Sequence, residues 1–320
     1  MLARILGVAL LTLWVCVPRV EVARAADVEV QRDLVNGGVV GIISGGVTGT
    51  YIRIAADLAN ALDDGYQLRI LSIIGKGSVR NIEDLLLLRG IDVAIVQSDV
   101  LDFYKRAALV PNIESKIRYI AKLYNEEVHV LAKSEHASID DLVGKRVNFG
   151  TEGSGTFMTA SLVFDDLGIE VDVRSDPEPI ALEKLRAGEL DAVVFVGGKP
   201  VTFIGEVDRQ EQLHLLAIPP ERIKAAYVPS ELTADAYPNL VDPGAPVQTV
   251  AVSAVLAAYN WPADHPRRQK LNRFIRSFLA NFGSLLQPPF HPKWREVDLN
   301  AAVPGWQRIT AAKQAAMAPE

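Results

Sequence analysis

The feature that most constrains the fold of this chain is a repeated alternation of short apolar runs with longer amphipathic segments. Runs rich in Val, Ile, Leu and Ala, which we expect to form strands, occupy 39–44, 68–74, 93–97, 128–132, 146–150, 192–196 and 213–218. Segments with helical periodicity lie at 51–62, 79–89, 100–108, 156–167 and 180–187. Strands that are apolar throughout are buried on both faces, and strand-then-helix order is typical of largely parallel sheets. We therefore predict an α/β fold.

The length and a change of composition predict two domains. At roughly 100 to 200 residues per domain, 320 residues fit two of them. Six prolines interrupt residues 217–247, and a long apolar run at 248–257 and a helical pattern at 265–281 follow. This order predicts a chain that leaves one lobe and later re-enters it. We expect lobe 1 at 27–126 and 248–320, lobe 2 at 127–247, and crossing strands at 128–132 and 248–254.

The first 25 residues have the pattern of a secretory signal peptide. Arg4 is followed by an apolar run over 5–17, and Ala23-Arg24-Ala25 is a small-x-small cleavage pattern. Thirteen apolar residues are short for a bilayer of ~20 residues' thickness. A signal-anchor helix is the alternative. The signal peptide predicts that the mature chain is periplasmic. The only cysteine, Cys16, lies in the removed segment, so the mature chain is expected to have no disulfide and no thiol nucleophile.

Charge and motifs exclude several classes of function. The mature chain carries 30 positive and 38 negative side chains without a basic cluster, which argues against nucleic-acid binding. No nucleophile elbow, Walker sequence or dinucleotide fingerprint occurs, and the five histidines show no zinc-type spacing. The adjacent pairs Glu126-Glu127 and Asp140-Asp141 should point apart or cap a helix rather than form an acid/base dyad. We expect no catalytic residue, metal or cofactor.

Polar, glycine-rich junctions follow five of the predicted strands, at 44–51, 75–81, 97–99, 150–156 and 197–200. Where a strand passes into a helix, free backbone N–H groups meet beyond the strand ends, and helix N-termini favour anions. The alternative is that Ser78, Ser98 and Ser154 or Thr156 are helix N-caps and the glycines serve the backbone. Lys76 is the candidate cation for an anionic ligand, or else a solvated loop lysine.

Five motifs in this order resemble the TAXI family, the extracytoplasmic solute-binding proteins of tripartite ATP-independent periplasmic (TRAP) transporters. The motifs lie at 44–51, 77–81, 92–99, 123–130 and 142–156, and the resemblance extends over about 39–285. It implies a two-lobed type II periplasmic-binding-protein fold, each lobe a mostly parallel sheet flanked by helices, joined by a two-strand hinge. It also implies capture of a small organic acid or amino acid and delivery to TRAP membrane subunits.

The predicted ligand site combines the strand-end junctions with positions matched to the family's cleft motifs. The matched positions are Thr50, Tyr51, Ser78, Asn81, Gln97, Ser98 and Ser154 to Thr156. The complete predicted set is Ser44, Thr48, Thr50, Tyr51, Lys76, Gly77, Ser78, Asn81, Gln97, Ser98, Gly153, Ser154, Gly155, Thr156 and Gly198. A binding protein for an ABC importer, a sensor-input protein and an exported α/β enzyme remain as alternatives.

Overall fold

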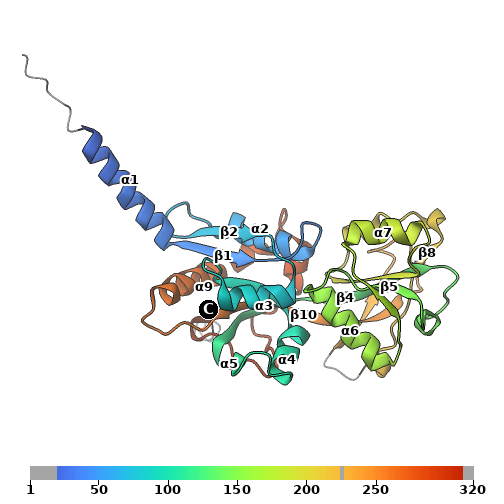
Figure 1. Cartoon of the computed structure of the whole chain (residues 1–320). Helices are drawn as coiled ribbons and strands as arrows, with labels where there is room; N and C mark the ends of the chain where they lie inside the picture. The colour runs from blue at the N-terminus through green and yellow to red at the C-terminus, as the bar shows by residue number, and fades with distance from the viewer. Residues whose placement is uncertain (1–19, 224–226, 313–320) are drawn as a thin grey trace, which may run out of the picture.

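The computed structural model describes residues 20–223 and 227–312, which form one sheet path flanked by helices (Figure 1). The strands are β1 Val39–Ile43, β2 Arg69–Ile73, β3 Val93–Gln97, β4 Ile117–Lys133, β5 Arg146–Asn148, β6 Asp172–Arg174, β7 Ala192–Gly197, β8 Leu213–Leu215, β9 Val228–Leu232 and β10 Val247–Tyr259. The α-helices are α1 Val20–Gly37, α2 Thr50–Leu62, α3 Ser78–Leu87, α4 Ser98–Arg106, α5 Ile113–Lys116, α6 Gly155–Leu167, α7 Glu178–Arg186, α8 Thr202–Gly205 and α9 Pro266–Leu285. Short 3-10 turns are η1 Ile139–Leu142, η2 Arg209–Glu211, η3 Pro220–Arg222 and η4 Pro292–Glu296.

Two parallel groups of strands are joined by a pair of long antiparallel strands. The sheet order is β2-β1-β3-β10-β4-β7-β5-β6, with β8 beside β4 and β9 beside β10. β1 pairs in parallel with β2 and β3, and β5 pairs in parallel with β6 and β7. Both β4 and β10 are antiparallel to every strand that they contact. Figure 1 shows the two groups of strands and their helices side by side, with β4 and β10 between them.

The hydrophobic cores divide at the same place. In β3, Val93 and Ile95 pack in one core while Ala94 and Val96 pack in the core on the opposite face, which explains its continuous apolar sequence. β7 is likewise buried on both faces. Along β4 the core membership changes between Tyr124 and Val128, and along β10 between Val252 and Ala254. These cores confirm the predicted α/β fold of two lobes joined by two strands.

Three strands, β4, β6 and β9, were missed or predicted too short from the sequence. β4 is 17 residues long, whereas only 128–132 was predicted, because β4 belongs to both lobes and its first half is interrupted by the polar residues Arg118, Lys122 and Asn125. β6 was not predicted because all three of its residues are exposed, and β9 was not predicted because it contains Pro229.

The predicted signal peptide, residues 1–25, falls mostly outside the described residues, which begin at Val20. Within the described ranges, no helix is both long enough and apolar enough to cross a bilayer.

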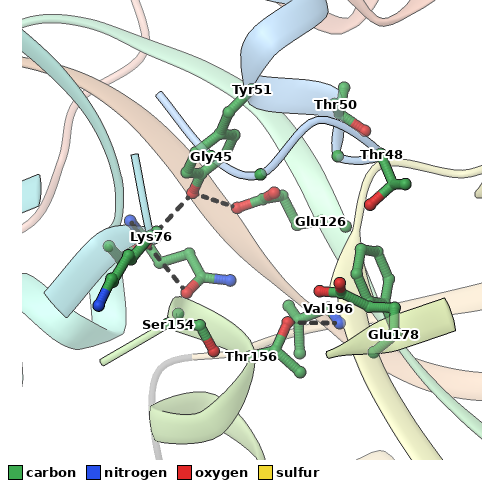
Figure 2. Close-up of a pocket in the computed structure, with 18 residues that line it drawn as sticks. Gly45, Thr48, Thr50, Tyr51, Lys76, Glu126, Ser154, Thr156, Glu178 and Val196 are labelled. Atoms are coloured by element: carbon green, nitrogen blue, oxygen red, sulfur yellow. Dashed lines mark hydrogen bonds between the residues drawn. The ribbon is translucent and has the colours of Figure 1, made fainter. Parts of the chain in front are cut away.

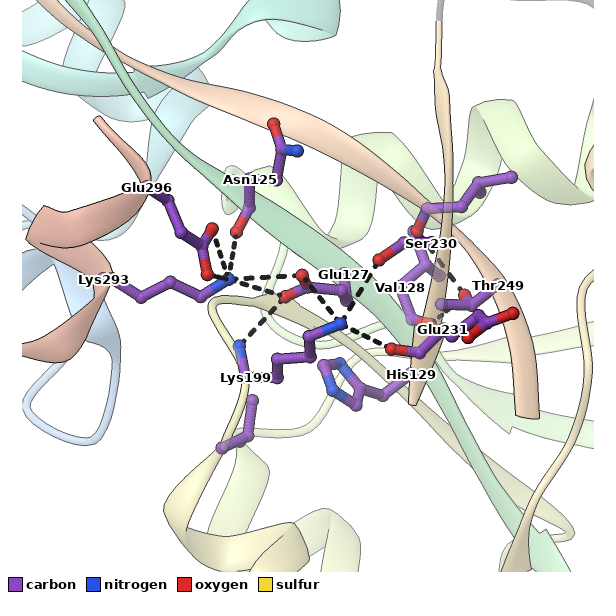
Figure 3. A network of polar contacts seen from close by, with 12 residues as sticks. Asn125, Glu127, Val128, His129, Lys199, Ser230, Glu231, Thr249, Lys293 and Glu296 are labelled. Atoms are coloured by element: carbon purple, nitrogen blue, oxygen red, sulfur yellow. Dashed lines mark hydrogen bonds and ion pairs between the residues drawn. The ribbon is translucent and has the colours of Figure 1, made fainter. Parts of the chain in front are cut away.

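A buried polar network lies where β4 passes from one lobe to the other (Figure 3). Lys293, from η4, is 1% exposed and its Nζ lies 3.2 Å from Glu127 Oε1 and 2.8 Å from Glu296 Oε1. Lys293 Nζ also donates to the Asn125 carbonyl. On the other side, Lys199 donates its backbone N–H to Glu127 Oε2 at 3.0 Å and places Nζ 3.6 Å from Oε1. Glu127 therefore holds cations from both lobes.

Loss of this buried cation should destabilise the chain far more than loss of an exposed one. Lys293→Met leaves the buried Glu127 carboxylate without its closest cation, and we expect a loss of ~3 to 5 kcal/mol in the free energy of unfolding. Arg209→Met is the control, because its pair with Asp242 is mostly exposed and should contribute ~0 to 1 kcal/mol. Urea unfolding of both variants measures the difference. Equal effects would contradict the assigned role of Lys293.

Candidate functional site

A cavity lies between the two lobes at the carboxyl ends of the parallel strands (Figure 2). With its open mouth it contains about 480 Å³ of space, and the centres of water-sized molecules can occupy about 70 Å³ of it. Its lining comes from both lobes: Gly45, Gly46, Thr48, Gly49, Thr50, Tyr51, Lys76, Gly77, Ser78, Gln97 and Glu126, together with Ser154, Gly155, Thr156, Glu178, Phe195, Val196 and Gly197.

Among the described residues, three helices have both their N-cap and their first residue in the lining of this cavity. The N-caps of α2 and α3 are Gly49 and Gly77, which have no side chain to accept the first free N–H groups. Ser154 caps α6 and accepts the Phe157 N–H at 3.0 Å. Three N-termini therefore present N–H donors and partial positive charge to one space, which favours an anionic group there.

A chain of hydrogen bonds forms the floor of the cavity. Tyr51 donates its phenol to Glu126 Oε2 at 2.7 Å and lies 3.4 Å from Ser78 Oγ. Ser78 donates to Gln97 Oε1 at 3.2 Å and accepts the Gln97 backbone N–H at 3.0 Å. The Ser78 hydroxyl thus serves β3 rather than capping α3. The side chains of α2, α3, β3 and β4 are fixed against each other by this chain.

Glu126 is the buried acid of the site. It is 2% exposed, and burial raises the pKa of its carboxyl to about 8. The same burial, together with the Glu126 charge, raises the pKa of the Tyr51 phenol, so Tyr51 stays a hydrogen-bond donor. At neutral pH the floor therefore holds a largely protonated carboxyl beside a neutral phenol.

Direct contacts close the lobes around the cavity. Asp99, on α4, accepts hydrogen bonds from Thr159 at 2.7 Å and Tyr227 at 2.8 Å, both from the other lobe. The Arg80 backbone N–H donates to the Gly153 carbonyl at 3.1 Å. The closest approach is at Gly155, where a Cβ would lie 1.8 Å from Gln97 Oε1. Glycine is required there by the fit of α6 against the opposite lobe.

Ten of the fifteen predicted ligand residues line the cavity: Thr48, Thr50, Tyr51, Lys76, Gly77, Ser78, Gln97, Ser154, Gly155 and Thr156. They come from loops separated by up to about a hundred residues in sequence. Thr156 also accepts the Val196 N–H at 3.2 Å, which joins α6 to β7. Contact of these residues with a solute remains a prediction.

The other five predicted residues lie behind or beside the lining. Ser44 is fully buried and donates to the Ile73 carbonyl, and the Asn81 amide donates to the carbonyls of Ser44 and Ile95. These two residues hold the strand ends together rather than face the cavity. Ser98 begins α4 outside the lining. Gly153 contacts Arg80 across the lobes, and Gly198 packs against Lys293 and Tyr124.

Eight lining residues were not predicted from the sequence: Glu126, Glu178, Phe195 and Val196, and four glycines beside predicted positions, Gly45, Gly46, Gly49 and Gly197. Glu126 and Glu127 do point apart, as predicted for adjacent strand residues, but Glu126 faces the cavity while Glu127 faces Lys293. Two acids beside a buried crossing strand were the available signal. Glu178 begins α7, and its sequence surroundings gave no signal.

A cluster of two acidic residues and a histidine lies away from the cavity. Glu135, His136 and Asp191 place ligand atoms within 4.8 Å of one another, as a metal site would require. Asp191, however, lies 3.0 Å from Arg146 and 3.8 Å from Lys133. These cations already neutralise its charge, which makes the cluster poorly suited to a metal ion.

The fold is similar to that of a solved periplasmic binding protein. The periplasmic binding protein BugD is similar with a TM-score of 0.51 and 12% identity, covering 81% of this chain and 87% of BugD. MatC from Rhodopseudomonas palustris, solved with bound malate, has a TM-score of 0.47 and 16% identity over 78% of this chain and 86% of MatC. The BugD likeness confirms the predicted type II periplasmic-binding-protein fold. Residues 42–265 match the NMT1-like family, and the chain belongs to that family.

A side chain at Gly155 should separate the lobes without unfolding them. In Gly155→Ala the new methyl group would meet Gln97 Oε1 and Ser78 Oγ, and such overpacking costs ~1 to 3 kcal/mol against the closed arrangement. We expect a larger radius of gyration by small-angle X-ray scattering, with the melting temperature kept. Gly283→Ala is the control, because nothing lies within 4 Å of its Cβ. An unchanged radius for Gly155→Ala would contradict the close fit.

The raised pKa of Glu126 predicts a pH-dependent cost to stability. A carboxyl whose pKa rises from 4.5 to about 8 on folding binds its proton more tightly when folded. Its contribution to stability is therefore full below about pH 4.5 and is lost as the pH rises through 8. At ~1.4 kcal/mol per pKa unit, Glu126→Gln should be a few kcal/mol more stable than the wild type at pH 8 and no more stable at pH 4.5. Denaturant midpoints across this range measure the gap, and a constant gap would contradict the assignment.

Proposed function

We propose that the chain is an extracytoplasmic solute-binding protein that holds a small organic anion or an amino acid between its lobes. The observation that carries this proposal is the interlobe cavity, lined from both lobes and surrounded by three helix N-termini. A solute seated there contacts both lobes at once and so favours their closure. Membership of the NMT1-like family and the likeness to BugD support this proposal at the level of family and fold.

We assign the lobes as 27–126 with 248–320, and 127–247. The changes of core along β4 and β10 support a boundary near these positions. β4 and β10 then form the hinge, and Glu127 binds lysines on either side of it. Opening and closing change the backbone angles of a few residues here, while the cores of both lobes stay packed.

The lining favours binding over catalysis. In the part of the chain that the structure describes, no lining residue is a histidine or a cysteine, and the lining serines are already engaged, Ser154 as a helix cap and Ser78 with Gln97. A hydrolytic serine would need a base within hydrogen-bond reach, and Glu126 is instead bonded to Tyr51. An exported α/β enzyme is therefore the weaker alternative.

For delivery, we propose the membrane subunits of a TRAP transporter, with this chain as a TAXI-type binding subunit in the periplasm. The motifs at 44–51, 77–81 and 142–156, which carry the resemblance to that family, supply most of the cavity lining. The pattern at 1–25 supports export by a signal peptide. An ABC importer or a sensor receptor would use the same cavity and differ in the partner that the closed lobes contact.

The proposal predicts stabilisation by a solute without turnover. A solute at 100 times its dissociation constant should add ~2.7 kcal/mol to the free energy of unfolding, which is roughly 5 to 10 °C in melting temperature for a chain of this size. Thermal melts with a library of organic acids and amino acids should show a few such shifts. Mass spectrometry of the same mixtures should find every solute unchanged.

Two outcomes would contradict parts of this proposal. Product formation would reject binding without chemistry, and a library without any stabilising solute would reject the solute class. Uptake into vesicles that contain the cognate membrane subunits distinguishes the partners. Uptake without ATP is what the TRAP assignment requires, and dependence on ATP hydrolysis would assign an ABC importer.

A further inference from the structure

The charges that line the cavity do not match those of a simple anion site. Among the described residues, the lining contains two carboxyl groups, on Glu126 and Glu178, and one cationic side chain, on Lys76. Lys76 is exposed, whereas Glu126 is buried on the floor. In the view of Figure 2, Lys76 and Glu178 lie on opposite sides of the cavity with Glu126 between them. A dianionic solute would meet the Glu178 carboxylate and one screened cation, and it would oppose any ionisation of Glu126, which is unfavourable.

Neutral donors already suffice for one carboxylate. The N-termini of α2, α3 and α6 open on the cavity with their first N–H groups, and two of their caps are glycines. A carboxylate held there needs no side-chain cation, because aligned N–H groups supply the partial positive charge. The acids on the floor and the far wall are therefore left for another part of the solute.

Glu126 lacks a cation of its own. Among the described residues its hydrogen-bond donor is Tyr51, which reaches Oε2 and leaves Oε1 available on the cavity side. The Lys293 charge acts on Glu126, but Lys293 Nζ is bound by Glu127, Glu296 and the Asn125 carbonyl. A buried carboxyl without a paired cation is either neutral or paired by a ligand.

We propose that the solute carries a protonated amine beside its carboxylate, as an α-amino acid does, and that Glu126 binds the amine. This inference rests on the proposed function and narrows its solute class. The carboxylate lies at the helix N-termini, the ammonium group donates to Glu126 Oε1, and Glu178 adds a second negative charge at the other wall. Glu126 is then the residue that distinguishes amino acids from organic acids of the same shape.

Proton release is a consequence of this arrangement. Without a cation beside it, Glu126 holds a proton below about pH 8, and an ammonium group in contact with it favours the ionised form. The charged and titratable groups that act on it are Tyr51 from α2, Asp99 from α4, Lys293 from η4, and Tyr124 and Glu127 from β4. Binding at pH 6.5 should therefore release up to one proton per solute.

The test uses solutes that differ only in the amine. Calorimetry compares the twenty standard amino acids with 2-hydroxy acids of the same side chains, such as alanine with lactate and aspartate with malate. For the best amino acid, we expect binding at least ~30-fold tighter than that of its 2-hydroxy acid, as for other buried charge pairs that lose one partner. Titrations at pH 6.5 in two buffers of different ionisation enthalpy measure the proton release on the wild-type protein.

Variants assign the effect to Glu126. Glu126→Gln should weaken the best amino acid at least ~30-fold, abolish proton release and leave 2-hydroxy acid binding unchanged or tighter. Glu178→Gln is the matched control, because Glu178 is only partly buried and should cost less than ~10-fold with proton release kept. The wild-type comparison needs no variant, so a folding defect in Glu126→Gln does not affect it.

Two results would overturn the inference. Equal or tighter binding of the 2-hydroxy acids, or proton uptake in place of release, would mean that Glu126 stays protonated and donates to an organic anion. The solute-binding function would then stand with a different solute class. Failure of every amino acid to bind the wild-type protein would also reject the inference, while the wider melting screen decides the proposed function separately.

Discussion

The antiparallel pairing of β4 with β10 is the constraint on which the rest of this structure depends. Each strand contributes its first half to one lobe and its second half to the other, so the backbone hydrogen bonds run from β3 to β7 without a break. The ladder has two register shifts, and the one between Ser253 and Val255 falls where the cores change, while the other lies between Leu256 and Ala257. A regular ladder would resist bending there, and a local irregularity lowers that resistance. The position of the cavity residues relative to the opposite lobe depends on this strand pair, together with the direct interlobe contacts of Asp99, Arg80 and Gly155.

The site places acidic side chains among groups that favour anions. Helix N-termini and Lys76 supply positive potential, while Glu126 and Glu178 supply carboxyl groups in the same lining. This combination separates the two ends of a zwitterion and penalises a ligand of uniform charge. Burial of Glu126 strengthens the discrimination, because an unpaired charge costs most where water is excluded. Tyr51 donates its hydroxyl to Glu126 Oε2, which leaves Glu126 Oε1 to accept a donor from the solute.

The sequence was informative where the physics is local and uninformative where it depends on register. The apolar runs of β1, β3 and β7 predicted buried parallel strands because both faces of each strand are covered. The junctions at 44–51 and 150–156 predicted helix N-termini at one edge of the sheet, because each junction joins the end of a parallel strand to a helix. Which of Glu126 and Glu127 faces the cavity could not be predicted, because a shift of one residue exchanges the two faces of a strand. Gly198 and Asn81 were predicted at the site because they are near it in the chain. Gly198 instead packs against Lys293, which is distant in sequence, and the Asn81 amide donates to the Ser44 carbonyl rather than facing the cavity.

The hydrogen bonds of Asp99 to Thr159 and Tyr227 join the lobes through protein groups alone. In the proposed hinge motion these hydrogen bonds favour the closed arrangement, and the apparent affinity for the proposed solute scales with the closed fraction. A change at Asp99 therefore multiplies the affinities for all solutes by the same factor, while a change at the cavity floor alters their ratios. Tightness and selectivity are in this way encoded by separate residues, so that evolution can adjust the protein to the concentration of its solute without redesigning what it recognises.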